Sequence, residues 1–319
     1  MRQAVVEALV ARAAVDPRIV VLTGDLGWSV LEPFQERFAR RFVNCGVAEQ
    51  HMLGVATGLA EAGYTPFVYS IATFATLRPF EQLRAGPALM RLPVRVLGVG
   101  GGFDYGPAGT THHGLEDLGA MRLLPGLTVL APADAAQARS ALDAVWDLPG
   151  PVYLRVGKDE RPATPGLDGR FRLGRVEVVR EGREVLLLAT GGAGGTAVEA
   201  AGRLQAQGIA CTVAVAACLA PEPREDLARL LSTHALTVCV EEHLRQGGLF
   251  ALAADVRSGL AEGSRVVGCH VDPTRLGPVG SAPWLRARHG LDAGGVAARV
   301  MDALQGEGRD GEGRYIGSP

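Results

Sequence analysis

Short apolar runs alternate with amphipathic segments along the first half of the chain. An uninterrupted apolar run is typical of a strand that is covered on both faces of a sheet, and apolar positions at helical spacing predict a helix. Strands and helices in alternation predict right-handed crossovers and a mostly parallel sheet flanked by helices. The expected strands are 19–23, 42–45, 66–69, 94–99, 128–131 and 152–156, and the expected helices are 47–62, 74–90 and 134–146.

The second half repeats this alternation after a segment without apolar periodicity. Residues 158–175 carry prolines, glycines and charges, which are typical of a connection between domains. We therefore predict an α/β protein of two domains, each a mostly parallel sheet flanked by helices. The expected strands are 185–189, 211–215, 236–240 and 265–271, and the expected helices are 195–207, 224–233, 248–259 and 294–304. The predicted division is a first domain at 1–160, a linker at 161–178, a second domain at 179–306 and a disordered glycine-rich tail at 307–319.

Composition and charge narrow the class of partner. The 319 residues are 47% hydrophobic, and 32 basic residues nearly balance 34 acidic ones. Such a balance gives no field that would attract nucleic acid or an anionic membrane, so we expect a small-molecule or protein partner. The five cysteines show no CxxC spacing, which favours neither a disulfide framework nor a zinc site. We expect a protein of the reducing cytoplasm, without a signal peptide or a membrane span.

One carboxylate stands at the start of the helix expected over 47–62. Glu49 follows a short strand-like run, and Gly54 and Gly58 come later in the same helix, where their missing side chains would allow close packing. A carboxylate beside an apolar, closely packed surface is costly unless it has a partner or a chemical role. The alternative is an ordinary first-turn acid favoured by the helix dipole.

Two glycine-rich loops follow expected strands. Residues 100–113 form a long loop that ends in hydroxyls and imidazoles, at the sheet edge where α/β proteins bind ligands. His112 and His113 are adjacent and have no third ligand nearby, so hydrogen bonding or proton transfer to a substrate is favoured over a metal site, with a structural turn as the alternative. The loop 189–195 lacks a GxGxxG register, which favours a tight turn over a dinucleotide site.

Five segments, taken in order, resemble the carboxyl-terminal two thirds of transketolases, which comprise the pyrimidine-binding domain and a smaller domain after it. The resemblance covers nearly the whole chain. The segment that contains Glu49 is equally similar to 1-deoxyxylulose-5-phosphate synthases, and the β subunits of 2-oxoacid dehydrogenases share the architecture. The segments are Thr23-Gly24-Asp25-Leu26, Gly46-Val47-Ala48-Glu49-Gln50-His51, Tyr69-Ser70-Ile71-Ala72-Thr73-Phe74, Gly109-Thr110-Thr111-His112-His113 and Tyr153-Leu154-Arg155.

The resemblance implies thiamine diphosphate as the cofactor and Glu49 as a catalytic residue. In these enzymes the matching glutamate hydrogen-bonds N1′ of the aminopyrimidine, which helps the cofactor lose the proton on C2. Phe74 matches the ring that stacks on the pyrimidine, Phe80 matches a second aromatic residue, and Leu77 replaces an aromatic found in many transketolases. From the residues alone, the same three side chains also fit an ordinary core stripe at helical spacing.

The resemblance also implies a set of substrate contacts. His112 matches a catalytic histidine that contacts the donor hydroxyls, and His113 stands where glutamine is usual. Asp25 matches an acid near the thiazolium of the cofactor, although an aspartate after a strand is also a common helix cap. Two departures, Ala108 in place of an aspartate and Gly100 in place of a histidine, leave donor stereochemistry and phosphate recognition open. The residues that match a binding site for the acceptor's phosphate are Arg2, Ser29 and Arg155.

A metal motif of the family is not found in this sequence. The related enzymes hold the diphosphate through a divalent ion bound by Gly-Asp-Gly and a later asparagine, whereas Gly24-Asp25-Leu26 lacks the third glycine. We therefore expect no metal ligand in this chain, with Mg²⁺ or Ca²⁺ held mainly by a partner subunit that carries the motif. The expected assembly is an α2β2 heterotetramer with two active sites, and the chain alone should be inactive.

The leading interpretation is the pyrimidine-binding subunit of a heteromeric transketolase. Such an enzyme transfers a two-carbon ketol unit from a ketose or ketose phosphate to an aldose acceptor. The alternatives are a subunit similar to 1-deoxyxylulose-5-phosphate synthase or to the E1β chain of 2-oxoacid dehydrogenases, and a non-catalytic scaffold. The sequence names neither the sugar nor the partner, and it does not separate primary from specialised metabolism.

Overall fold

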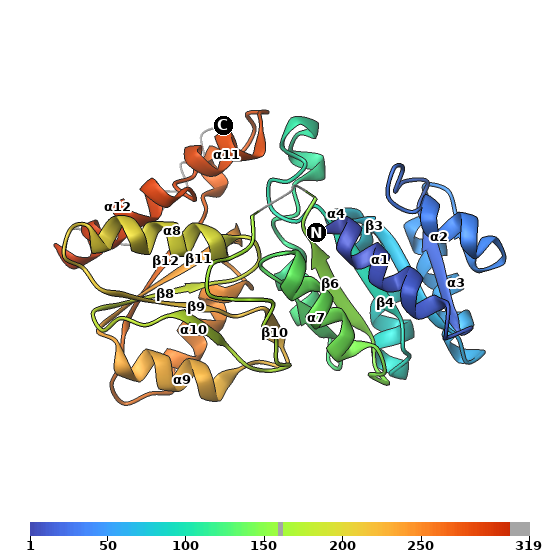
Figure 1. Ribbon diagram of the computed structural model, residues 1–319, viewed down its shortest axis with the longest axis horizontal. Coiled ribbons are helices and arrows are strands. Elements are labelled where there is room, and N and C mark those ends of the chain that lie inside the picture. The colour runs from blue at the N-terminus through green and yellow to red at the C-terminus, as the bar shows by residue number, and fades with distance from the viewer. Residues whose placement is uncertain (159–161, 307–319) are drawn as a thin grey trace, which may run out of the picture.

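The computed structural model describes residues 1–158 and 162–306, and these form two α/β domains (Figure 1). Each domain is a mostly parallel sheet with helices on both faces, so the predicted fold class is confirmed. The predicted tail at 307–319 and the first residue of the predicted linker lie outside the described residues. No helix in the described ranges is long and apolar enough to cross a membrane.

The first sheet has seven strands in the order β10-β5-β6-β4-β3-β1-β2. Six of them are parallel and come from the first domain, and β10 (Cys218–Ala220) comes from the second and runs antiparallel to β5. Thr23 at the end of β1 is level with both Asn44 and Tyr69, so the carboxyl ends of three strands lie together. The six strands are β1 (Ile19–Thr23), β2 (Phe42–Asn44), β3 (Thr65–Ile71), β4 (Arg95–Val99), β5 (Thr128–Leu130) and β6 (Val152–Val156).

Two hydrophobic cores cover the two faces of this sheet. In β1, Ile19 and Val21 face one core, and Val20 and Leu22 face the other, as the two-residue period of a strand requires. The first core holds side chains of α1 (Arg2–Ala13), α2 (Glu32–Arg37) and α7 (Ala135–Val145). The second holds side chains of α3 (Glu49–Glu61), α4 (Ala72–Leu77), α5 (Phe80–Leu83) and α6 (Asp117–Arg122).

The helix expected over 74–90 is broken into three pieces. α4 ends at Leu77, α5 spans Phe80–Leu83, and a π-helical turn spans Arg84–Ala88. Pro79 and Pro87 have no backbone N–H to donate, so a continuous α-helix is disfavoured across both positions. The apolar spacing in this segment predicted neither these breaks nor the exposure of Leu77.

The second sheet has five strands in the order β12-β11-β8-β9-β7. Four are parallel, and β7 (Glu177–Arg180), which begins within the last residues of the predicted linker, is antiparallel to β9. The parallel strands are β8 (Val185–Ala189), β9 (Cys211–Val215), β11 (Leu236–Leu244) and β12 (Arg265–Val271). The helices are α8 (Ala193–Gln205), α9 (Arg224–Thr233), α10 (Leu249–Ser258), α11 (Ala282–Arg288) and α12 (Ala293–Leu304).

The glycine-rich loop after β8 packs against the first domain. Gly191 has a φ of 59° and its N–H donates to the carbonyl of Ala131, and a Cβ on Gly194 would lie 3.0 Å from that of Ala133. A larger residue at 194 would need this contact to open. The loop is therefore a tight turn at the contact between domains.

Candidate active site

Glu49 lies buried at the carboxyl ends of two parallel strands. It is the first residue of α3, its side chain is 3% exposed, and Oε1 lies 3.4 Å from Ser70 Oγ on β3. Gly24, just after β1, is close enough that an added Cβ would lie 3.7 Å from Oε1. A burial as deep as this distinguishes Glu49 from an ordinary solvated first-turn acid.

The glycines later in α3 do not make the close contacts that we expected of them. Within the described residues, no atom would lie within 4 Å of a Cβ added at Gly54 or Gly58, apart from the helix's own backbone and adjacent residues. Both positions are exposed. The expected close packing against this face is therefore absent from the described part of the chain.

The ion-pair partner of Glu49 is Arg78, a residue that the sequence analysis did not single out. Arg78 Nη1 lies 3.1 Å from one carboxylate oxygen of Glu49 and 3.0 Å from the other. The arginine side chain is 43% exposed, whereas the glutamate is almost fully buried. The Arg78 guanidinium therefore closes the solvent-facing side of the buried carboxylate.

The ring of Phe74 connects this ion pair to the histidine loop. Arg78 Cζ lies 3.7 Å from the centroid of the Phe74 ring, within cation–π range, and the His112 ring centroid lies 5.0 Å away on an inclined plane. His112 Nδ1 is 2.9 Å from Thr111 Oγ1. Phe74 therefore contacts His112 directly, and Arg78 connects Phe74 to Glu49. The residues that the resemblance placed in one site thus lie together.

Leu77 and Phe80 do not share one face with Phe74. Leu77 is exposed, whereas Phe80 is half-buried and packs against the core beneath α3. The break after α4 separates them. The core interpretation therefore suits Phe80, while Leu77 is available to a partner or ligand.

Asp25 and Ser29 lie in the exposed loop between β1 and α2. Asp25 has a φ of 60°, and it exchanges two hydrogen bonds with Asn44, of 3.1 and 3.0 Å. Asn44 Oδ1 also accepts from Gly46 N at 3.0 Å, so this contact anchors the segment that leads to Glu49. α2 begins at Glu32, so Asp25 is not a helix cap. Ser29 donates its N–H to Glu32 Oε1 at 2.8 Å.

His113 lies in a different environment from His112. It is buried, its Nε2 is 3.3 Å from the carbonyl oxygen of Gly106, and its Nδ1 has no hydrogen-bond partner among the described residues. Its ring packs edge-on against Phe103, which stacks on His289 of the second domain at 5.0 Å. Burial lowers the pKa of His113. The two histidines, which we expected to bind substrate side by side, therefore have different surroundings, and His113 belongs to the contact between domains.

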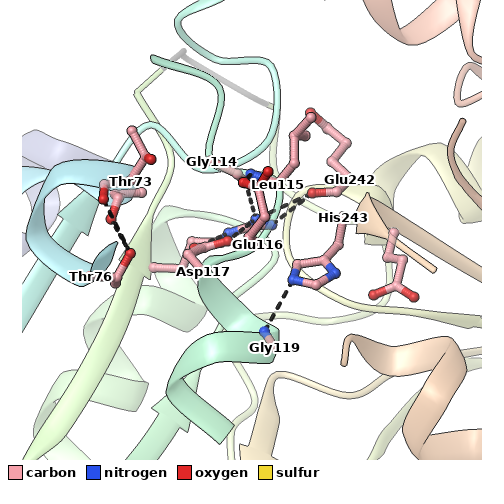
Figure 2. Close-up of polar contacts among 12 residues, drawn as sticks. Thr73, Thr76, Gly114, Leu115, Glu116, Asp117, Gly119, Glu242 and His243 are labelled. Carbon is pink, nitrogen blue, oxygen red and sulfur yellow. Dashed lines mark hydrogen bonds and ion pairs between the residues drawn. The ribbon is translucent and has the colours of Figure 1, made fainter. Parts of the chain in front are cut away.

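Arg155 is also an interior residue rather than a surface arginine. Its Nε and Nη2 donate to the two carboxylate oxygens of Asp117 at 2.8 and 2.6 Å, and both of its Nη atoms donate to the carbonyl of Glu242 at 3.2 Å. Figure 2 shows Asp117 and Glu242 in this region, with His243 accepting a hydrogen bond from the N–H of Gly119. Burial opposes the charge, but Asp117 outweighs it and raises the pKa of Arg155. These internal partners differ from the substrate phosphate that the resemblance implied.

Arg2 lies beside the end of β3. It is the first residue of α1 and neighbours Tyr69, where its charge and hydrogen bond partly offset the burial that raises the pKa of Tyr69 to about 12. Among the described residues, no group of three or more His, Cys, Asp or Glu side chains could hold a metal ion.

The chain is a two-domain α/β protein in which an acid, an aromatic ring and an imidazole lie together beyond the strand ends. Residues 1–163 match the model of the transketolase pyrimidine-binding domain, and residues 174–296 match that of the transketolase C-terminal domain. The chain therefore belongs to the transketolase family, as the sequence predicted.

Several relatives are similar over nearly their full length. The chain is 32% identical to one subunit of an apulose-4-phosphate transketolase of Phocaeicola vulgatus, covering 95% of this chain and 97% of that protein. It is 34% identical to the 6-deoxy-6-sulfo-D-fructose transketolase subunit SqwH of Clostridium sp. (strain MSTE9), covering 92% and 91%. A solved split-gene transketolase, described as an inactive β4 tetramer, is 37% identical with a TM-score of 0.83, covering 95% and 97%.

A second group of relatives is matched over half its length. The chain is 32% identical to 1-deoxy-D-xylulose-5-phosphate synthase of Dictyoglomus turgidum, covering 94% of this chain but 48% of that enzyme. The chain is thus similar to both groups, as the segment that contains Glu49 predicted.

The chemistry of Glu49 and Phe74 fits thiamine diphosphate, the cofactor that membership of this family implies. The guanidinium of Arg78 is a planar, nitrogen-bearing group that hydrogen-bonds Glu49 and lies over the ring of Phe74. An aminopyrimidine is also planar and nitrogen-bearing, and it can use the same carboxylate and the same ring face. The carboxylate and the aromatic face thus have the chemistry that a pyrimidine ring requires.

Proposed function

We propose that this chain is the pyrimidine-binding subunit of a heteromeric, thiamine diphosphate-dependent transketolase that transfers a two-carbon ketol unit from a ketose, or its phosphate, to an aldose. The observation that carries this proposal is the cluster of Glu49, Phe74 and His112. A buried carboxylate, an aromatic face and an imidazole from three separate segments converge beyond the strand ends. The names of the nearly full-length relatives support the same reaction class.

Each member of the cluster has a distinct chemical task. Thiamine diphosphate would supply a carbon nucleophile that can hold the transferred fragment. Glu49 would bind N1′ of the aminopyrimidine and share a proton with it, in a site that burial keeps apart from bulk water. Phe74 would fix the plane of the ring, and His112, beside Phe74, would hydrogen-bond the donor hydroxyls. Asp25 and Leu77 would lie around the cofactor, with Phe80 supporting the pocket from the core.

The partner is proposed to be a subunit that carries the Gly-Asp-Gly motif and holds the diphosphate through Mg²⁺ or Ca²⁺. The description of a related solved structure as an inactive β4 tetramer supports a chain that needs such a partner, and we propose an α2β2 assembly. Exposed apolar side chains offer a surface for it. They include Trp28, Val47, Leu89, Met90 and Leu123.

The substrate is proposed only as a small sugar or sugar phosphate. Related subunits are named for different ketoses, and this chain has Ala108 and Gly100 where transketolases carry polar donor contacts. Arg2 and Ser29 remain proposed phosphate ligands. Arg155 and His113 are weaker candidates, because their side chains are buried among internal partners. We propose a cytoplasmic location, consistent with five free cysteines in the described residues.

The test is to tag this chain in its native host, purify it gently and record the intact mass of the complex with any bound cofactor. A co-purifying subunit and thiamine diphosphate are expected. The complex should then turn over a ketose with an aldehyde acceptor. Turnover of pyruvate or another 2-oxoacid without a ketose would favour the synthase or dehydrogenase alternative. A lone chain that binds neither thiamine diphosphate nor a partner would contradict the enzyme proposal and favour a scaffold.

A further inference from the structure

Arg78 makes two contacts at once with the proposed pyrimidine site. One is the pair of hydrogen bonds to Glu49, at 3.1 and 3.0 Å, and the other is the position of its Cζ 3.7 Å from the centroid of Phe74. Carbon atoms in van der Waals contact lie about 3.5–4.0 Å apart, so the guanidinium carbon fills the space directly above the Phe74 ring. A second flat group cannot occupy the same space on this side of the ring.

We propose that Arg78 is an internal competitor for the pyrimidine site, and that an aminopyrimidine binds Glu49 and Phe74 by displacing the Arg78 side chain. This inference rests on the proposed function and adds to it a residue that controls access to Glu49. The guanidinium makes hydrogen bonds to the carboxylate and lies over the face of Phe74, the two positions that the ring would need. The two groups therefore exclude each other.

The surroundings of Arg78 allow this exchange. The residue lies between the end of α4 and Pro79, and its side chain is 43% exposed, so the guanidinium can turn into solvent without any change in a packed helix. Glu49 is 3% exposed, and Arg78 is its ion-pair partner in the described part of the chain. A buried carboxylate that loses one partner is stabilised only when another donor replaces it. The site therefore favours exchange with a donor-bearing ring over simple opening.

The chemical consequence is selectivity. A ligand that stacks on Phe74 without donating to Glu49 would displace Arg78 and leave the carboxylate uncompensated, which is unfavourable. A flat ring that both stacks and donates replaces both contacts of the arginine. Arg78 thus favours the binding of an aminopyrimidine over the binding of an apolar ring.

The test measures binding of 4-amino-5-hydroxymethyl-2-methylpyrimidine, the pyrimidine half of thiamine, to the full chain by ligand-observed NMR titration. The probe lacks the diphosphate, so its binding does not depend on a partner's metal site. The variants are Arg78→Met, which keeps length without charge, and Arg78→Gln as a second, polar replacement. The matched control is Arg84→Met, which breaks an exposed ion pair with Glu81 further along the same segment. Thermal unfolding of each variant confirms that it is folded.

Removal of the competitor is expected to strengthen binding of the probe by about two- to five-fold in both Arg78 variants, the range that a partly exposed ion pair allows. Arg84→Met should bind as the wild type does, and Glu49→Gln should abolish the gain when it is combined with Arg78→Met. Equal or weaker binding in both Arg78 variants, with the wild type still binding, would contradict the proposal that Arg78 competes for the site. The proposed function would not be affected. If the probe binds neither the wild type nor any of the folded variants, the proposed pyrimidine site is wrong, and both proposals fail.

Discussion

Asp117 and Arg155 form a two-point ion pair in the interior of the protein. Asp117 Oδ1 and Oδ2 accept from Arg155 Nη2 and Nε at 2.6 and 2.8 Å, and both side chains are buried. Tyr153 Oη also donates to Asp117 Oδ2, at 2.5 Å. Because Arg155 also donates to the carbonyl of Glu242, this pair links the end of β6 in the first domain to β11 in the second.

Replacing Arg155 with methionine is expected to lower the free energy of unfolding by about 3–5 kcal/mol, because Asp117 would remain charged and buried without its partner. Chemical denaturation monitored by circular dichroism measures the loss. Arg139→Met is the control, because the pair between Arg139 and Glu7 is exposed and should change stability by less than about 1 kcal/mol. A loss for Arg155→Met no larger than that of the control would contradict this structural role.

The sequence predicted the elements whose signals are local. The strand at 19–23 has the predicted bounds, and the helix that begins at Glu49 starts within two residues of the prediction, because continuous apolar runs and helical spacing are properties of neighbouring residues. β10 was missed, because its three residues are strand only through pairing with β5, which lies far away in the sequence. A short apolar run by itself does not show whether a distant strand pairs with it.

The difference between local signals and long-range contacts also explains which site residues were predicted. Glu49, Phe74 and His112 were proposed from motifs, and the fold brings them together. Arg78 had one local signal, its spacing of four residues after Phe74, which places a cation over the ring on one helical face. Its pairing with Glu49 joins residues 29 apart and depends on how β3 and α3 pack.

The buried histidines predict a pH dependence of stability. Burial lowers the pKa of both His113 and His289 below the ordinary value of 6.5. The unfolded chain therefore binds protons more readily, so stability is highest above about pH 6.5 and is lost as the pH falls toward the folded-state values. His113→Gln should reduce the difference in melting temperature between about pH 7.5 and about pH 5.5. His51→Gln, at an exposed position, is the control, and an unchanged pH difference in His113→Gln would refute the prediction.

Glu242 is expected to hold the loop that carries His112. Its Oε2 accepts from Phe103 N at 3.2 Å, and its Oε1 accepts from Arg286 Nε at 2.9 Å. Glutamine has one acceptor oxygen, so Glu242→Gln cannot keep both contacts. Hydrogen exchange at the Phe103 amide should become about ten-fold faster or more, which is the effect of losing one charge-assisted hydrogen bond. Glu199→Gln, which loses a surface ion pair with Arg203, is the control, and its Phe103 amide should exchange at the wild-type rate. A wild-type exchange rate in Glu242→Gln would contradict the prediction.

Glu49→Gln separates catalysis from scaffolding. Glutamine keeps the size of the side chain but cannot take up a proton, so we expect the purified complex to assemble normally and to lose about 10²- to 10⁴-fold in turnover, the usual contribution of a positioned acid–base group. Glu81→Gln is the matched control, because Glu81 is an exposed acid that pairs with Arg84. Initial-rate kinetics and intact-mass measurements on the same samples distinguish loss of chemistry from loss of assembly. Turnover that survives Glu49→Gln in an intact complex would remove Glu49 from the mechanism. The deep burial of its side chain would then be explained by its contacts with Arg78 and Ser70.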